Sequence, residues 1–288
     1  MGFWKSFFGG KAEDPEEKRR SEEARNFDVL KYDGVRALQT HQAGYAIECF
    51  RHALALQEDL EVRDYLSQAF IQTGQLPQAY DELQKLAEAQ PDNQALFLRM
   101  AHVAYMMEDY GAMGSACERA MLISQDNPEI YYMYARGCAG QDDLVNAEAM
   151  LTKALSLNAD YAEAHLLRGE VRAKNGESGA ADEDAAWLLE RLPDSEDVLM
   201  LKAHVERSRG QLTEALGWYD KVIDANPFCM EAFRERMELR TRLGDTAGAD
   251  DDRRKLSELM ATSPLAATDG GIEEKVKKAY DNINPLGL

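Results

Sequence analysis

The 288-residue sequence predicts an all-α protein built as a solenoid of stacked antiparallel helical hairpins. Three observations predict this class: small residues recur every 33 or 34 positions, glycines fall between them, and prolines close several of the intervals. One such hairpin cannot bury its apolar faces alone, whereas stacked neighbours can. We therefore expect a core spread along seven hairpins, in place of the one or two compact cores that this length would otherwise suggest.

The repeat is carried by four sets of positions. The first small set lies on the first helix of each hairpin and comprises Gly34, Ser67, Ala101, Ala135, Gly169 and Ala203. The second lies on the partner helix and comprises Ala46, Ala79, Met113, Ala147, Ala181, Ala215 and Ala249. Turn glycines separate the two helices at Gly74, Gly176, Gly210 and Gly244, and Pro91, Pro193 and Pro227 follow the second helix. Small side chains on both partners let the two helix backbones approach closely.

The sixth repeat shows how each hairpin arises. The segment Asp197 to Arg209 is rich in helix formers, and its apolar residues have helical spacing. Gly210 suits the left-handed residue that ends a helix. Thr213 is an N-cap candidate for a second helix reaching Ala225, and a proline two residues later cannot continue it.

Over residues 27–263 this pattern resembles the tetratricopeptide repeat family, as seven repeats. Large and small residues of the second helices also carry the resemblance: Phe50, Leu83, Leu151, Tyr219, Ala53, Ala120 and Ala154. The resemblance implies a right-handed superhelical solenoid whose first helices line a concave groove. The sequence departs from the family pattern in the first, third and seventh repeats, at His41, Glu58, Met113, Met237 and Arg253.

The charge, the apolar runs and the cysteines of the sequence exclude some classes of function. Residues 1–26 hold six basic and six acidic side chains, so the whole net charge of −19 belongs to residues 27–288. So acidic a chain is repelled by phosphate backbones, and we exclude nucleic-acid binding. No apolar run is long enough to span a bilayer, and no signal-peptide pattern follows the start, so we expect a cytoplasmic protein. The four cysteines, without a C-x-x-C pair, are expected to be reduced thiols.

No motif for catalysis, a metal or a cofactor emerges, and we expect a non-enzymatic protein. His102 and His204 occupy the same place in the third and sixth repeats and are expected to line the groove or to be hydrogen-bonded. The acidic runs Asp182–Asp184 and Asp250–Asp252 lie on predicted second helices. Since neighbours on a helix point in different directions, we expect both runs on solvated faces.

The groove positions implied by the resemblance form an aromatic and methionine stripe with interspersed arginines. Tyrosine and arginine are typical anchors at protein interfaces, and methionine adapts to varied partners. A protein or peptide with apolar side chains and some carboxylates would suit such a stripe. Some of these positions are expected to belong to the core between repeats. The predicted set is Tyr32, Tyr65, Arg99, Tyr105, Met106, Tyr132, Met133, Arg136, Leu166 and Met200.

One binding mode of the family is disfavoured. The clamp for acidic chaperone tails needs lysine, arginine and two asparagines on three first helices. The corresponding residues are Lys31, Val35, Tyr65, Ala95 and Arg99, so both asparagines are missing. Valine and tyrosine cannot replace the paired donor and acceptor of asparagine.

The first eleven residues concentrate aromatic side chains, at Phe3, Trp4, Phe7 and Phe8, beside Lys5 and Lys11. This segment resembles the short amphipathic leader of the bacterial signal-recognition-particle receptor, and Met1-Gly2 with Ser6 fits an N-myristoylation pattern. Three interpretations stay open: peripheral attachment to the inner face of a membrane, docking in a groove, and disorder. The charged segment from Glu13 to Arg25 has the composition to extend the first repeat as a helix.

Residues 264–288 are predicted to cap the seventh repeat with an amphipathic helix, or else to form a loosely docked tail. The apolar stripe of that helix comprises Ile272, Val276, Ala279, Tyr280 and Ile283. The leading functional hypothesis is a protein-interaction scaffold or adaptor of unknown partner. The alternative is a structural, self-assembling module that uses the N-terminal segment or the end faces of the solenoid.

Overall fold

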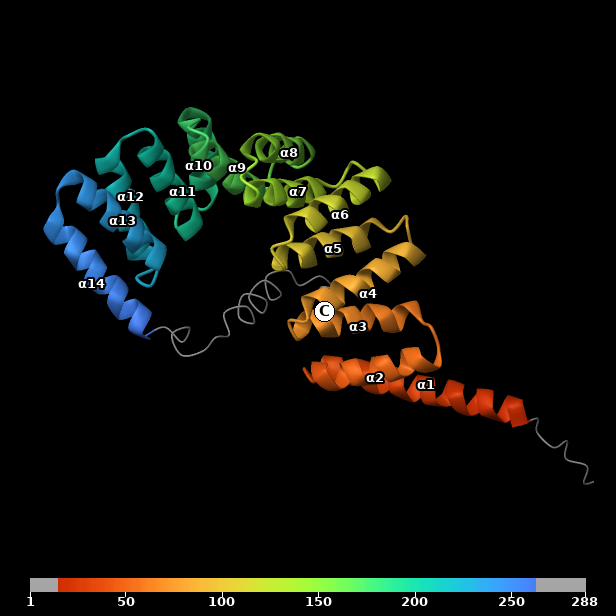
Figure 1. Ribbon diagram of the computed structural model, residues 1–288. Coiled ribbons are helices and arrows are strands. Elements are labelled where there is room, and N and C mark those ends of the chain that lie inside the picture. Colours follow the sequence, from red (N-terminus) through yellow and green to blue (C-terminus); the bar gives the residue numbers. More distant parts are fainter. Residues whose placement is uncertain (1–14, 263–288) are drawn as a thin grey trace, which may run out of the picture. The chain divides into compact units, whose positions relative to one another are not determined.

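The computed structural model describes residues 15–262, and every regular element of this part is a helix (Figure 1). Successive helices pack as antiparallel hairpins, which confirms the predicted all-α array of hairpins. Contacts divide the described chain into unit 1, up to Gln90, and unit 2, from Pro91 onward. Unit 1 contains α1 (Pro15–Gln39), α2 (Ala43–Leu56), α3 (Leu60–Gln72) and α4 (Leu76–Ala89).

Unit 2 contains five hairpins. Their helices are α5 (Gln94–Met106), α6 (Tyr110–Ile123), α7 (Pro128–Gly140), α8 (Leu144–Leu157), α9 (Ala162–Lys174), α10 (Ser178–Arg191), α11 (Glu196–Ser208), α12 (Leu212–Ala225), α13 (Met230–Leu243) and α14 (Thr246–Thr262). The sixth-repeat helices predicted over 197–209 and 213–225 thus lie within one residue of their observed ends. No helix of the described chain is long and apolar enough to span a bilayer.

Each hairpin turns through one residue in the left-handed conformation. Four are the predicted turn glycines, with φ between 72° and 83°, and the other three are His41, Glu108 and Asp142, with φ of 58°, 58° and 63°. The amide of the next residue then bonds a carbonyl five residues back, as from Gln75 to Phe70 at 2.9 Å. The first repeat therefore turns in the same way without its glycine, and each side chain held there costs about 1–2 kcal/mol.

The small positions of the two helices are buried, as the close approach of backbones requires. A Cβ added to Gly34 would lie 2.5 Å from Cε1 of Phe50, and one added to Gly169 would lie 2.7 Å from Cδ2 of Leu201. Met113, which stands in the alanine set, is fully buried. It fits because its Sδ lies against Gly137, where an added Cβ would come within 3.4 Å.

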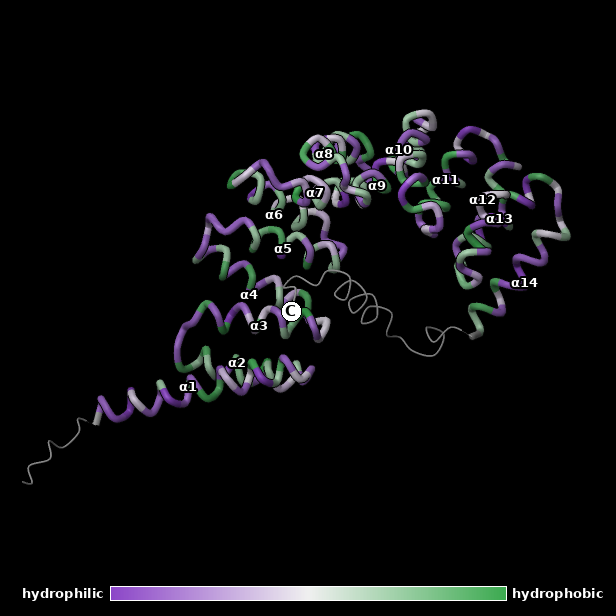
Figure 2. Tube along the Cα trace, turned by 180° about the vertical axis from the view of Figure 1, so that it is seen from behind, coloured by the Kyte–Doolittle hydropathy of each residue, from purple (hydrophilic) through white to green (hydrophobic). Residues whose placement is uncertain are grey.

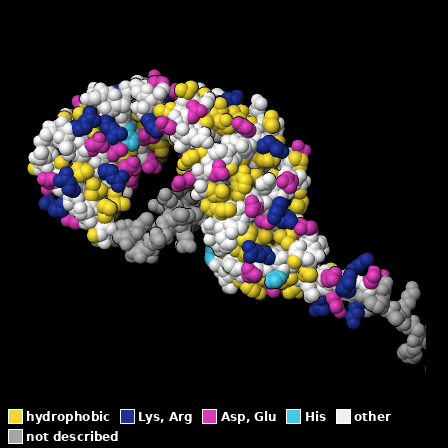
Figure 3. Space-filling view, in the orientation of Figure 1, with side chains coloured by type: hydrophobic (Ala, Val, Ile, Leu, Met, Phe, Trp, Pro, Cys, Tyr) yellow, Lys and Arg dark blue, Asp and Glu magenta, His cyan; other side chains and the backbone are white. Residues whose placement is uncertain are grey.

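Helix α1 begins at Pro15, well before the predicted start of the repeats at residue 27. Residues 16–26 are all exposed, and they project past α2 as a hydrophilic helix (Figure 2). Basic and acidic side chains lie together along this projection (Figure 3) and form i,i+4 ion pairs between Arg19 and Glu23 and between Arg20 and Glu16. The charged linker thus extends the first repeat as a helix. The aromatic segment of residues 1–11 and the capping helix lie outside the described residues.

Candidate partner-binding surface

Four side chains from α5, α7 and the residue before α9 meet at one surface of unit 2. Tyr105 comes from α5, Tyr132 and Arg136 from α7, and Tyr161 directly precedes α9. The Arg136 guanidinium carbon lies 3.6 Å from the Tyr105 ring centroid and 5.6 Å from that of Tyr132. The rings of Tyr132 and Tyr161 are 5.1 Å apart, tilted by 47°. We call these four residues, all of them half-buried, the tyrosine–arginine surface.

The hydrogen-bonding capacity of Arg136 is largely unused. One Nη donates weakly to Sδ of Met133 at 3.9 Å, and no carboxylate of the described residues forms an ion pair with the guanidinium. Stacking on a ring occupies the face of the guanidinium and leaves its in-plane N–H donors free. Arg136 is therefore a cation held in place by aromatic contacts and available to an outside acceptor.

Burial acts on the tyrosines of this surface. It raises the pKa of Tyr132 and, together with the neighbouring Tyr132 and Glu129, that of Tyr161. Both phenols therefore remain protonated donors at neutral pH. At the edge, Nε2 of His102 lies 3.2 Å from Oε1 of Glu129, while the buried Nδ1 of His102 has no hydrogen-bond partner. The surface thus combines aromatic rings with phenol and guanidinium donors.

The predicted stripe separates into several parts. Tyr105, Tyr132 and Arg136 come together, and Arg99 and Met106 are half-buried on α5. Leu166 packs against a buried cluster of α9, α10 and α11.

Two members of the predicted stripe belong to the core. Met133 is 0 % exposed and Met200 is 7 % exposed, so their assignment to the groove is wrong. Both methionines lie on the side of a first helix that packs against neighbouring helices. The periodicity of the sequence alone could not distinguish that side from the side that faces the groove.

Tyr32 and Tyr65 belong to unit 1. Tyr32 is 71 % exposed, whereas Tyr65 stacks on Phe50 at 5.7 Å and donates to Glu61 at 3.1 Å. Tyr161 was missed, because it precedes its helix and falls outside the first-helix positions that define the stripe.

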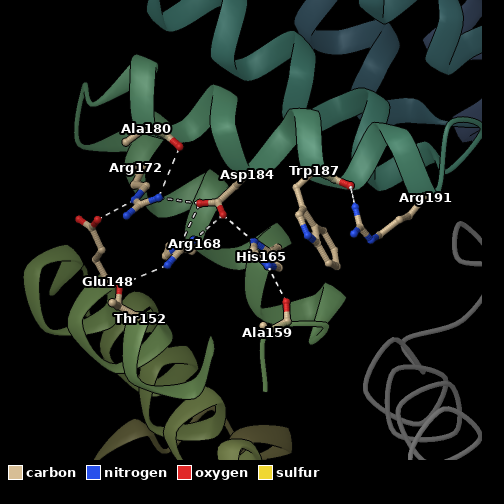
Figure 4. A network of polar contacts seen from close by, with 10 residues as sticks. All are labelled: Glu148, Thr152, Ala159, His165, Arg168, Arg172, Ala180, Asp184, Trp187 and Arg191. Atoms are coloured by element: carbon tan, nitrogen blue, oxygen red, sulfur yellow. Dashed lines mark hydrogen bonds and ion pairs between the residues drawn. The ribbon is translucent and has the colours of Figure 1, made fainter. Parts of the chain in front are cut away.

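Inside the hairpins of unit 2 lies a carboxylate network (Figure 4). The Asp184 side chain on α10 is only 1 % exposed. On α9, Arg168 donates to both of its oxygens, at 2.7 and 3.0 Å, and Arg172 donates at 2.9 Å. Nδ1 of His165 lies 2.7 Å away. Arg172 also donates to Glu148 on α8 at 2.6 Å, so the network joins two successive hairpins.

The same arrangement recurs two repeats later. Asp252 on α14, whose side chain is 2 % exposed, accepts from Arg236 at 2.6 and 3.2 Å and from Arg240 at 2.9 Å. In unit 1, Glu82 accepts from Arg63 at 2.5 Å at the corresponding place. These acids hold the two helices of one hairpin together.

The expectation that both acidic runs lie on solvated faces is therefore wrong for Asp184 and Asp252. The spacing of the arginines identifies them: Arg168 and Arg172 precede Asp184 by 16 and 12 residues, and Arg236 and Arg240 precede Asp252 by the same intervals. An acid repeated in phase with two arginines on the partner helix indicates a buried ion pair, whereas a run of acids taken alone does not.

A second network joins the first helices α9, α11 and α13. Nδ1 of His204 lies 2.8 Å from Glu170, and Nε2 lies 2.9 Å from Glu235. Glu235 also accepts from Tyr219 and pairs with Arg207 at 3.3 Å. Burial acts to lower the pKa of His204, but the two glutamates outweigh it and raise the pKa to about 10. The pKa of Glu235 falls to about 2, because its hydrogen bonds outweigh burial.

Within the described residues, no group of histidine, cysteine, aspartate and glutamate side chains has the arrangement of a metal site. Both histidines that were expected to line the groove or to be hydrogen-bonded lie within hydrogen-bonding distance of glutamates.

Comparison with known proteins identifies the fold. No family model and no curated protein matches the sequence. Among solved structures, a tetratricopeptide repeat protein from Parabacteroides merdae superposes with a TM-score of 0.71 at 13% identity, over 88% of this chain and 99% of its own. PilW, a type IV pilus biogenesis factor, gives 0.63 at 19% identity over 71% and 95%. YrrB, a tetratricopeptide protein with an unusual peptide-binding site, gives 0.53 at 21% identity over 66% and 98%. The chain therefore has the tetratricopeptide repeat fold.

Proposed function

We propose that the protein is a protein-interaction scaffold that captures a protein or peptide at the first-helix surface of α5, α7 and α9. The observation that carries this proposal is the tyrosine–arginine surface, where aromatic rings lie beside a guanidinium that has no ion-pair partner among the described residues. Such residues concentrate binding free energy at interfaces. YrrB, which is similar in fold, has a peptide-binding site, and this likeness supports the same kind of role here.

The proposed role is non-enzymatic, since the acids and bases of the two networks in unit 2 are engaged with one another. His204 is held between Glu170 and Glu235, and Asp184 accepts from two arginines. Acids and bases that saturate each other in this way stabilise a fold and are not poised to act on a substrate.

A random twelve-residue peptide library displayed on phage tests the proposal with the full chain immobilised. We expect selected peptides to bind the wild-type chain at least tenfold more tightly than the variant Tyr132→Ala. Tyr45→Ala is the matched control, because this exposed tyrosine lies on α2 in unit 1. Equal binding by Tyr132→Ala and the wild-type chain would contradict the assigned surface.

We further propose that residues 1–11 attach the scaffold to the inner face of a membrane. The support is the sequence alone: Phe3, Trp4, Phe7 and Phe8 beside two lysines. Each large apolar side chain contributes roughly 1.5–3 kcal/mol on full burial, so partial insertion of four is sufficient for reversible attachment. Vesicle sedimentation of the intact chain and of a chain lacking residues 1–10 tests this, and equal partitioning would exclude it.

Self-assembly is the second candidate, and exposed apolar side chains on the first hairpin favour it. Val29 and Tyr32 on α1 and Tyr45 on α2 are 53, 71 and 57 % exposed. Light scattering would show a mass that rises with concentration and falls in Tyr32→Ala with Tyr45→Ala. A constant monomer mass would exclude this candidate.

A further inference from the structure

Arg136 occupies a position that recurs through the first helices of unit 2. The corresponding residues in the neighbouring repeats are His102 on α5, Glu170 on α9 and His204 on α11. His102 lies 3.2 Å from Glu129, and Glu170 and His204 lie 2.8 Å from each other. The next residue of the series, Glu238 on α13, is exposed, whereas these four are half-buried. Of the four half-buried residues, Arg136 is the one to which no ionisable side chain of the described chain is paired.

A basic residue on the first helix of unit 1 shows the ordinary arrangement. Nζ of Lys31 on α1 lies 3.5 Å from Asp59 and 2.6 Å from Glu61, and its hydrogen bond to Glu61 raises its pKa. Lys31 is thus neutralised within the chain. Arg136 instead has Tyr105 against its face and donates to the sulfur of Met133.

From this contrast, and resting on the proposed function, we propose that Arg136 receives a carboxylate from the bound partner. The occupant we assign is a peptide segment of another protein in which an aspartate or glutamate neighbours an apolar or aromatic residue. The planar guanidinium offers two parallel N–H donors that match a carboxylate. The rings of Tyr132 and Tyr161 give the neighbouring side chain an apolar contact.

The stacking also explains why arginine suits this place. The Tyr105 ring fixes the guanidinium plane before binding, so less side-chain entropy is lost when the ion pair forms. Lysine would keep the charge but would lose both the planar stacking and the paired donors. The two phenols stay protonated and therefore add donors without adding negative charge beside the incoming acid.

The experiment starts from the phage-selected twelve-residue peptides that require Tyr132. We expect an acidic residue enriched at one position of these peptides. A synthetic peptide should bind Arg136→Gln at least tenfold more weakly than the wild-type chain, and its own Asp→Asn or Glu→Gln version should lose the same factor on the wild-type chain. On Arg136→Gln the two peptides should bind equally, as the double-mutant cycle requires.

Arg119→Gln is the matched control. Arg119 on the second helix α6 stacks on Phe97 at 5.2 Å, and its substitution should change affinity less than twofold. Arg136→Lys should fall between the wild-type chain and Arg136→Gln. Arg136→Glu should regain binding to a peptide whose acid is changed to lysine. Circular dichroism on each variant verifies that the array is folded.

The outcomes separate the two proposals. If no selected peptide depends on Tyr132, the proposed function itself fails. If selected peptides depend on Tyr132 but show no acidic preference, or bind Arg136→Gln within twofold of the wild-type chain, only the role of Arg136 is overturned. If peptides bind only after residues 264–288 are removed, the occupant is this chain's own segment and the assignment of a foreign partner is overturned.

Discussion

The two ends of unit 2 use the same hairpin in different ways. In the region of α5 to α8, the first-helix surface carries Tyr105, Tyr132 and Arg136, and the guanidinium has no carboxylate partner among the described residues. In the region of α9 to α14, Asp184, His204 and Asp252 each pair with oppositely charged side chains of the chain itself. The same hairpin architecture thus stabilises the fold through ion pairs in α9 to α14, and in α5 to α8 it leaves the Arg136 guanidinium without an ion-pair partner among the described residues.

The turns show the same contrast. The hairpins α5–α6 and α7–α8 turn through Glu108 and Asp142 in the left-handed conformation, whereas the later hairpins turn through Gly176, Gly210 and Gly244. A side chain with a Cβ is strained in this conformation, and glycine is not. The turns of the hairpins α5–α6 and α7–α8 are therefore strained in their backbone, whereas the turns of the later hairpins are not.

The largest expected effect comes from the buried acids. Asp184→Ala leaves the half-buried Arg168 without its carboxylate partner and Arg172 with Glu148 alone, and we expect it to lower the free energy of unfolding by about 3–5 kcal/mol. Urea denaturation measures the change. Asp250→Ala is the control, because its pair with Arg253 is exposed, and it should change stability by less than about 0.5 kcal/mol. If Asp184→Ala lowers the free energy of unfolding by less than about 1 kcal/mol, the claim that ion pairs stabilise α9 to α14 is contradicted.

The His204 network should make stability depend on pH. The pKa of His204 is raised from 6.5 to about 10, so its contribution is complete below pH 6.5 and is lost as the pH rises to about 10. The pKa of Glu235 is lowered from 4.5 to about 2, so its contribution is complete above pH 4.5 and is lost as the pH falls to about 2.

Both contributions are therefore complete between pH 4.5 and 6.5. Between pH 6.5 and 10 we expect the wild-type chain to lose about 2–4 kcal/mol more than His204→Gln does. Urea titrations at several pH values measure this difference. Parallel pH profiles of the two proteins would show that the network contributes no linkage.

The strained turns give the next effect in size. Glu108→Gly should raise the free energy of unfolding by about 1 kcal/mol, because glycine adopts the positive φ without strain. Gly210→Ala should lower it by about the same amount, although an added Cβ would meet no atom within 4 Å. Thermal unfolding of both variants provides the measurement, and shifts of the same sign would be inconsistent with turn strain.

The smallest effect on stability belongs to the binding surface. Arg136→Gln removes aromatic stacking but no ion pair, so we expect a loss of at most about 1 kcal/mol. Urea denaturation beside Asp184→Ala measures this. A loss as large as that of Asp184→Ala would mean that Arg136 is a structural residue.

Sequence reasoning recovered most of the fold because its signals are local and periodic. The small positions, the turn glycines and Gly210 in particular lie where the spacing placed them, since backbone approach and positive φ tolerate few residue types. The sequence showed that Met113 departs from the alanine set, but it did not show that Gly137 on the next helix makes room for this larger side chain. Such a contact lies between repeats and leaves no periodic trace.

The candidate site was recovered only in part. Tyr105, Tyr132 and Arg136 were predicted, while Met133 was misplaced. Neighbouring residues of a helix are about 100° apart around its axis, so the buried Met133 directly follows the half-buried Tyr132. Tyr161 lies before its helix, where helical spacing no longer orients a side chain. That no acid of residues 15–262 pairs with Arg136 follows from side-chain positions on several helices, which no single segment encodes.

Hydrogen–deuterium exchange on the full chain, with and without a Tyr132-dependent peptide from the phage library, tests most directly which region binds. The division of unit 2 predicts slower exchange in α5, α7 and the first turn of α9, with α11 and α13 unchanged. Protection confined to α11 and α13, where His204 is held by two glutamates, would contradict it.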